Sequence, residues 1–118
     1  MTSSQIPEWV PVTTFKSGFS AQTWGDVPSY RIWPDGKVEW RGVIAGTMPT
    51  TSSEPVFTIP AAARPGRPKN KTAAASGSGV LRVEFGPLIS PTELYVFPDM
   101  VGGTRAWVSI DELYYYLP

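Results

Sequence analysis

Proline and glycine interrupt this chain often enough to favour short strands joined by turns over helices. Its 118 residues include thirteen prolines and eleven glycines, spread along the whole length. Proline inside a helix removes a backbone hydrogen bond and clashes with the preceding turn, and glycine favours turns. Between these breaks lie aromatic and β-branched residues, which favour short strands. The length fits one domain, so we predict a single all-β domain.

The clearest local pattern is a β-hairpin over residues 30–44. Two arms, residues 30–33 and 37–44, flank Pro34-Asp35-Gly36. Proline presets the first central position of such a turn, and glycine accepts the left-handed backbone that follows. Apolar and charged residues alternate in the second arm, as is typical of a strand with one buried and one exposed face. We expect Trp40 to lie on the buried face.

Further apolar runs between turn residues predict the other strands. They lie at residues 56–59, 80–85, 94–97, 106–110 and 113–117, with weaker patterns at 9–12 and 72–75. About seven or eight short strands at this spacing predict an antiparallel, jelly-roll-like β-sandwich. Residues 1–12 are then a tail with an edge strand, and residues 13–118 form the sandwich. The prolines within residues 61–71 predict an extended crossover there.

The residues that are missing exclude several kinds of chemistry. The chain has no histidine and no cysteine, which excludes triad hydrolases and histidine or thiolate metal sites. Lys plus Arg equal Asp plus Glu at ten each, so no overall charge favours nucleic acid. No apolar run approaches the roughly 20 residues that span a bilayer. We predict no cofactor, no metal, no membrane insertion and no enzyme activity. Two carboxylates performing glycoside hydrolysis are the less favoured alternative.

Aromatic residues near turns are the best candidates for binding a ligand. Rings stack on sugars and anchor interfaces at little cost in side-chain freedom. We predict ligand-binding roles for Trp24, Tyr30 and Trp33, although a core position for each is about equally favoured. Trp24 is also expected to cover the core together with nearby phenylalanines. Arg105 joins the ligand-binding set because it ends the loop at residues 98–105.

Two other segments are predicted to meet partner chains. The first is the run Tyr114, Tyr115 and Tyr116. Because successive side chains of a strand point to opposite faces, at least one of these rings is exposed unless another subunit covers it. We therefore predict a subunit interface here. Arg64 and Arg67 open a basic stretch that extends to residue 71 with no carboxylate between. Such a stretch suits an interface, an anionic glycan or a teichoic phosphate, although basic runs are more often simply solvated.

Three motifs in order resemble a known family. Tyr30-Arg31 precedes the hairpin that ends in Arg41-Gly42, residues 57–65 read FTIPAAARP, and residues 107–111 read WVSID. In this order they resemble the C-terminal β-sandwich domains of bacteriophage minor tail and tail-fibre proteins. The resemblance covers about residues 24–117. Such heads usually end a longer protein with a fibrous stalk, whereas this chain has only a short polar lead.

The resemblance implies a place in a virion, assembled in the host cytoplasm. It implies a homotrimeric head at the tip of a tail or fibre, which contacts other virion proteins and binds a saccharide of the host surface. The alternative is a capsid decoration or cement protein. That protein would stabilise the particle through its N-terminal tail and its trimer interface.

Overall fold

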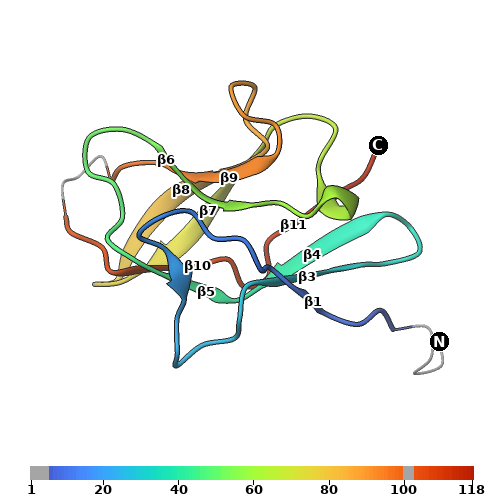
Figure 1. Cartoon of the computed structure of the whole chain (residues 1–118), viewed down its shortest axis with the longest axis horizontal. Coiled ribbons are helices and arrows are strands. Elements are labelled where there is room, and N and C mark those ends of the chain that lie inside the picture. Colours follow the sequence, from blue (N-terminus) through green and yellow to red (C-terminus); the bar gives the residue numbers. More distant parts are fainter. Residues whose placement is uncertain (1–5, 100–102) are drawn as a thin grey trace.

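The protein is a sandwich of two antiparallel β-sheets, as predicted. The computed structural model describes residues 6–99 and 103–118. One sheet has four strands and the other has seven. Figure 1 shows β3 and β4 of the smaller sheet on the right, and β7, β8 and β9 of the larger sheet on the left. The space between the sheets holds the core.

The strands are short. The four-stranded sheet has the order β1-β3-β4-β11, with bounds Val10–Pro11, Ser29–Ile32, Lys37–Arg41 and Tyr114–Tyr116. The seven-stranded sheet has the order β2-β5-β10-β7-β8-β9-β6, with bounds Ser20–Ala21, Val43–Ala45, Trp107–Ser109, Lys69–Ala75, Gly79–Phe85, Glu93–Val96 and Glu54–Thr58. These eleven strands in the described part exceed the predicted seven or eight, because the arm at residues 37–44 divides into β4 and β5 and because β2, of two residues, is too short to show an alternating pattern.

The predicted hairpin is confirmed, but its second arm divides between the sheets. β3 pairs with β4 around the turn at residues 33–36, with Ile32 opposite Val38. At Gly42 the chain turns, and β5 continues into the larger sheet. Strands β10 and β11 make the same passage alongside, and the Asp111 carboxylate accepts a hydrogen bond from the Gly42 N–H at 2.7 Å. We call this crossing between the sheets the corner.

The predicted crossover at residues 61–71 is partly wrong. The 3-10 turn η2 (Ala61–Ala63) follows β6, and β7 already begins at Lys69. All seven residues of β7 pair with β8, from Lys69 opposite Phe85 to Ala75 opposite Gly79. The prolines of this segment precede the strand, so they leave its hydrogen bonds intact.

A cluster of aromatic rings forms the centre of the core. Trp40 is fully buried, as predicted, and its ring centroid lies 5.3–5.5 Å from those of Tyr30, Phe57 and Phe85. Its indole N–H donates to the Tyr115 hydroxyl at 3.3 Å, and that hydroxyl donates to the Ala63 carbonyl at 2.5 Å. The side chains of both sheets thus form one interior.

Candidate functional site

Aromatic and charged side chains cover the outer face of the four-stranded sheet. In β4 the alternate residues Lys37, Glu39 and Arg41 point away from the core. The same alternation in β11 turns Tyr114 and Tyr116 outward. Together with neighbours on β3 and before β1, the outer face comprises Trp9, Arg31, Trp33, Lys37, Glu39, Arg41, Tyr114 and Tyr116.

One end of the outer face is centred on Trp9. The guanidinium carbons of Arg31 and Arg41 lie 4.2 Å and 4.4 Å from the centroid of the Trp9 ring. Glu39 accepts hydrogen bonds from Arg31 Nε at 2.7 Å and from Trp33 Nε1 at 2.9 Å. A pocket of about 440 Å³ opens here, lined by Trp9, Asp26, Glu39, Trp40, Arg41, Asp111 and Glu112. This end is rich in carboxylates, and its side chains already form hydrogen bonds and cation–π contacts with one another.

We expect Glu39 to make folding stability depend on acid pH. The hydrogen bond from Trp33, followed by the contact with Arg31, holds the pKa of this carboxyl below its usual value of 4.5. The stabilisation is therefore fully present above pH 4.5 and is lost as the pH falls through the lower folded-state pKa. Urea unfolding of the wild type and of Glu39→Gln should show a stability difference at about pH 7 that shrinks towards about pH 3. A difference independent of pH would contradict this role.

The other end of the outer face is centred on two tyrosines of β11. Tyr114 and Tyr116 are 46% and 51% exposed, and their ring centroids lie 6.2 Å apart with the planes nearly perpendicular. The ammonium nitrogen of Lys37 lies 4.7 Å from the Tyr114 centroid, and that of Lys71, from β7, lies 5.2 Å away. Cations near ring faces are attracted by the ring quadrupole. Both sheets therefore supply cations to Tyr114.

Two open pockets lie beside Tyr116. One has a volume of about 430 Å³ and is lined by Trp33, Pro34, Asp35, Lys37 and Tyr116. The other has a volume of about 270 Å³ and is lined by Gly66, Arg67, Lys69, Tyr116 and Pro118. We call the shared surface the tyrosine site and define it by Trp33, Lys37, Arg67, Lys69, Lys71, Tyr114 and Tyr116.

The tyrosine site brings together residues that the sequence analysis assigned to different roles. Trp33 was predicted to bind a ligand, and Tyr114, Tyr116 and Arg67 were predicted to form an interface. Tyr30 and Tyr115, predicted for the same two roles, lie in the core with 7% and 3% of their surface exposed. Burial raises the pKa of the Tyr115 hydroxyl well above its usual value. Strand alternation explains why Tyr115 points inward while its neighbours point outward.

Arg64 lies outside the tyrosine site. Its Nε donates to the Ile59 carbonyl at 2.9 Å, which ties the end of η2 back to the segment after β6. The basic stretch therefore divides between a residue that supports the backbone and later residues that flank Tyr116.

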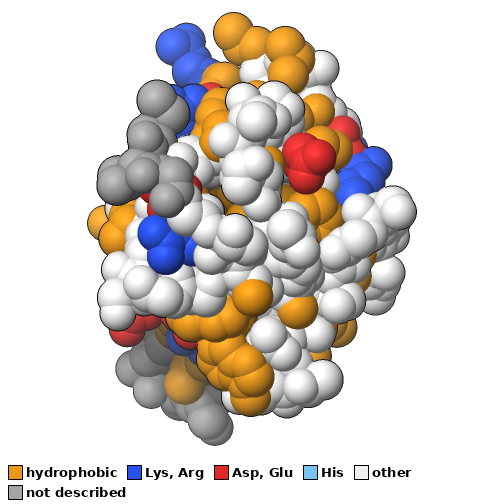
Figure 2. Space-filling model, turned by 90° about the vertical axis from the view of Figure 1, so that its left-hand side faces the viewer, with side chains coloured by type: hydrophobic (Ala, Val, Ile, Leu, Met, Phe, Trp, Pro, Cys, Tyr) orange, Lys and Arg blue, Asp and Glu red, His pale blue; other side chains and the backbone are white. Residues whose placement is uncertain are grey.

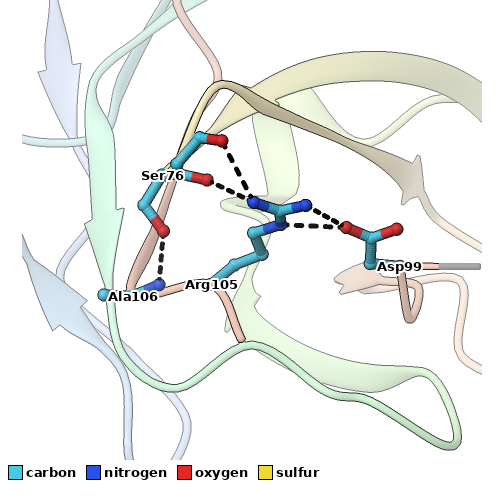
Figure 3. Close-up of polar contacts among 5 residues, drawn as sticks. Ser76, Asp99, Arg105 and Ala106 are labelled. Atoms are coloured by element: carbon cyan, nitrogen blue, oxygen red, sulfur yellow. Dashed lines mark hydrogen bonds and ion pairs between the residues drawn. The ribbon is translucent and has the colours of Figure 1, made fainter. Parts of the chain in front are cut away.

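Arg105 is also engaged in holding the backbone. Figure 3 shows its guanidinium between Asp99 and the turn at Ser76. Its Nε and one terminal nitrogen donate to Asp99 Oδ2 at 2.9 Å and 2.6 Å, and the other terminal nitrogen donates to the Ser76 carbonyl at 2.9 Å. These contacts join the β7–β8 turn to the segments on either side of residues 100–102, which lie outside the described residues.

Trp24 lies on a different part of the surface. It is 61% exposed, and its ring packs edge-on against Trp107 of β10 with centroids 5.1 Å apart. The expectation that it covers the core is wrong. Phe15 and Phe19, the phenylalanines expected to help it, are half-buried and pack against the core.

Apart from Arg67, sequence patterns did not single out the cations of the tyrosine site. Lys37 shows a weak signal, because it alternates with Glu39 and Arg41 on the exposed face of the hairpin. Lys69 and Lys71 were part of the basic stretch, but nothing in the sequence places them beside Tyr116 and Tyr114. For Trp9, at the other end of the outer face, no sequence pattern other than its being aromatic indicated a role in a site.

A separate apolar surface lies on the seven-stranded sheet. In the loop between β8 and β9, Leu88 and Ile89 are 85% and 81% exposed. They border a pocket of about 310 Å³ lined by Ser53, Pro68, Arg82, Glu84, Pro87, Leu88, Ile89, Tyr95 and Phe97. Figure 2 shows hydrophobic side chains gathered at the top of the molecule, the height at which this loop lies in Figure 1.

Within the described ranges, no three carboxylates gather in a way that could hold a metal ion. No helix in that part of the chain is long and apolar enough to cross a membrane. No family model, curated protein or solved structure matches the chain.

Proposed function

We propose that this chain is the head domain of a bacteriophage tail or tail fibre and that its tyrosine site binds a saccharide of the host surface. The order of the three motifs supports the place in a virion. Two of these motifs meet at the corner, where Gly42 of the first donates to Asp111 of the third. This hydrogen bond gives a structural reason for the presence of both motifs in this chain.

The observation that carries the saccharide proposal is the pair of open pockets that share Tyr116. Trp33 and Tyr116 border the larger pocket, and Tyr116 alone contributes a ring to the smaller one. Exposed aromatic rings offer an apolar face for the C–H groups of a sugar, and a tyrosine hydroxyl adds a hydrogen bond. A saccharide of several units could lie across Tyr116 and fill both pockets.

Binding to host cells should depend on the rings of the tyrosine site. We expect Tyr116→Ala and Trp33→Ala each to weaken binding to cell-surface polysaccharide by at least about tenfold, as anchor residues of binding sites do. Binding of purified domain to immobilised polysaccharide, measured by surface plasmon resonance, would show the change.

Trp24→Ala is the matched control, because it removes an exposed ring from another surface. It should leave polysaccharide binding unchanged. If the tyrosine-site variants bind as well as the wild type, or the control loses binding equally, the tyrosine site is not the saccharide site.

A capsid decoration or cement protein is the second candidate. Exposed apolar side chains at Leu88 and Ile89 favour it, because a monomer rarely leaves such a pair open to water beside an apolar pocket. Replacing both with serine should then release the protein from particles without changing polysaccharide binding. The predicted docking of the N-terminal tail depends in part on residues 1–5, which lie outside the described residues.

The proposal includes a homotrimer that binds without turnover. Light scattering in solution should give three times the chain mass of 12.9 kDa. Polysaccharide recovered after long incubation should be of unchanged length, since the alternative of glycoside hydrolysis would shorten it.

A further inference from the structure

We infer that the tyrosine site selects an anionic saccharide, one that carries carboxylate or phosphate groups. This inference rests on the proposed function and adds the charge of the ligand to it. Cations and carboxylates balance at ten each over the whole chain. Four of the ten cations nevertheless gather around two tyrosines, and they are Lys37, Arg67, Lys69 and Lys71.

The cations reach the tyrosines from both sheets. Lys37 extends from β4 and Lys71 from β7, and both ammonium groups lie near the ring of Tyr114. Arg67 and Lys69 line the smaller pocket beside Tyr116. Because the potentials of like charges add, Arg67 and Lys69 make the smaller pocket positive, whereas in the larger pocket Lys37 lies with Asp35.

In the described residues no carboxylate forms an ion pair with these four cations, although the charge of Lys37 helps to lower the pKa of Glu39. In the part of the chain that the structure describes, the ion pairs are Lys16–Glu93, Arg31–Glu39 and Arg105–Asp99. The carboxylate that lines the larger pocket belongs to Asp35, and its Oδ1 accepts a hydrogen bond from the Lys37 backbone N–H at 3.1 Å. That bond fixes the carboxylate within the hairpin turn but leaves its negative charge beside Lys37 in the larger pocket.

Charge is segregated along the outer face. Four carboxylates line the pocket at the Trp9 end, and they are Asp26, Glu39, Asp111 and Glu112. Arg31 and Arg41 also lie at that end, so its carboxylates outnumber its cations, whereas at the tyrosine end the four cations outnumber the carboxylate of Asp35. An anionic ligand would therefore be attracted to the tyrosine site and repelled from the neighbouring pocket, which also sets where along the sheet it binds.

The side chains suit a ligand with both a sugar ring and a negative group. An arginine can bind carboxylate or phosphate through two parallel hydrogen bonds, and lysines bind such groups as point charges. The rings of Trp33, Tyr114 and Tyr116 offer stacking surfaces between these cations. A neutral sugar would leave the cations unused, and a bare anion would leave the rings unused.

The charge selectivity can be measured with three probes of matched length. These are a galacturonic acid oligomer, a glycosylated glycerol phosphate oligomer and a neutral galactose oligomer, titrated into the wild-type protein by calorimetry. We expect at least one anionic probe to bind about tenfold or more tightly than the neutral one, and to weaken between about 0.05 M and about 0.5 M salt. The preferred probe identifies carboxylate or phosphate as the recognised group.

Substitutions locate the selectivity. The double variant Lys69→Gln with Lys71→Gln should lose about tenfold in affinity for the anionic probe and keep its affinity for the neutral one. Arg82→Gln is the control: this cation lies in β8 of the same sheet, but on the opposite face from Lys71, where its guanidinium carbon is 3.7 Å from the centroid of the Phe97 ring. It should bind all probes as the wild type does. Unchanged melting temperatures would show that the variants fold.

The outcomes separate this inference from the proposed function. Equal affinity for neutral and anionic probes, with Tyr116→Ala weakening both, would overturn the inference and support a neutral saccharide. Failure of all three probes to bind would overturn both. Tighter binding of a single-stranded oligonucleotide than of any saccharide would also overturn both, because the cations would then serve a nucleic acid.

Discussion

Replacing Gly42 with alanine should disrupt the fold more than any other single methyl addition at a glycine of the described residues. Gly42 has a φ of +122°, a conformation that side chains other than glycine rarely adopt. An added Cβ would lie 2.4 Å from the Cα and 2.5 Å from the nitrogen of Pro28. These are backbone atoms, so they cannot rotate away. The backbone strain costs about 1–2 kcal/mol, and overpacking adds about 1–3 kcal/mol or more.

The loss would be large because Gly42 joins the two sheets. Its N–H donates to Asp111, and its carbonyl accepts from the Ile110 N–H at 2.9 Å, so both chains of the corner depend on its position. Domains of this size are stable by only about 5–15 kcal/mol. Urea unfolding should show a much lower midpoint for Gly42→Ala, or no folded state at all.

Gly18→Ala is the matched control for backbone strain. Gly18 also has a positive φ, at +90°, but nothing lies within 4 Å of the position that its Cβ would take. It should therefore lose only the strain of about 1–2 kcal/mol. If both variants lost the same stability, the close approach of Pro28 would not explain the need for glycine at the corner.

Trp40→Ala should be the most damaging truncation in the core. The ring is fully buried, stacks on Phe57 at 5.5 Å and contacts Phe85 and Tyr30. Its removal would leave a cavity and would also take a donor from the buried Tyr115 hydroxyl. Such truncations cost about 3–5 kcal/mol. Thermal unfolding followed by near-ultraviolet circular dichroism should show a much lower midpoint.

Trp24→Ala removes the same side chain from the surface and serves as the comparison. That ring is mostly exposed, and the structure gives it one aromatic neighbour, Trp107. The cost should be within about 1 kcal/mol. A loss as large as that of Trp40→Ala would mean that the surface pair contributes as much to stability as the core stack does.

Local patterns were most reliable where one strand has a buried and an exposed side. The second arm of the hairpin around Asp35-Gly36 was predicted with its inward face, because alternation is visible within a few residues, and β8 was predicted to within one residue of its bounds. The same alternation places Tyr114 and Tyr116 on one face of the strand and Tyr115 on the other, but it does not indicate which face is buried. The start of β7 was misplaced, because Lys69, Asn70 and Lys71 are polar, show no apolar alternation and follow the prolines of the predicted crossover.

The candidate site was less predictable, because it joins segments that are distant in sequence. Lys37 and Tyr116 lie opposite one another only because β11 pairs antiparallel with β4. Lys71 approaches Tyr114 only because β7 of the larger sheet lies beside the edge of the smaller one. Arg105 looked like a free loop cation until its contacts with Asp99 and the Ser76 carbonyl were visible.

By itself the sequence determined that the chain is built from short strands, that its turns fall at proline and glycine, and that histidine and cysteine chemistry is absent. These properties are local, since they depend on backbone preferences and on the alternation of neighbouring side chains. The tertiary structure decided which sheet each strand joins, that the corner at Gly42 transfers the chain between sheets, and which cations surround the tyrosines. These features depend on pairings across the core, where the burial of distant apolar side chains selects one arrangement of the strands.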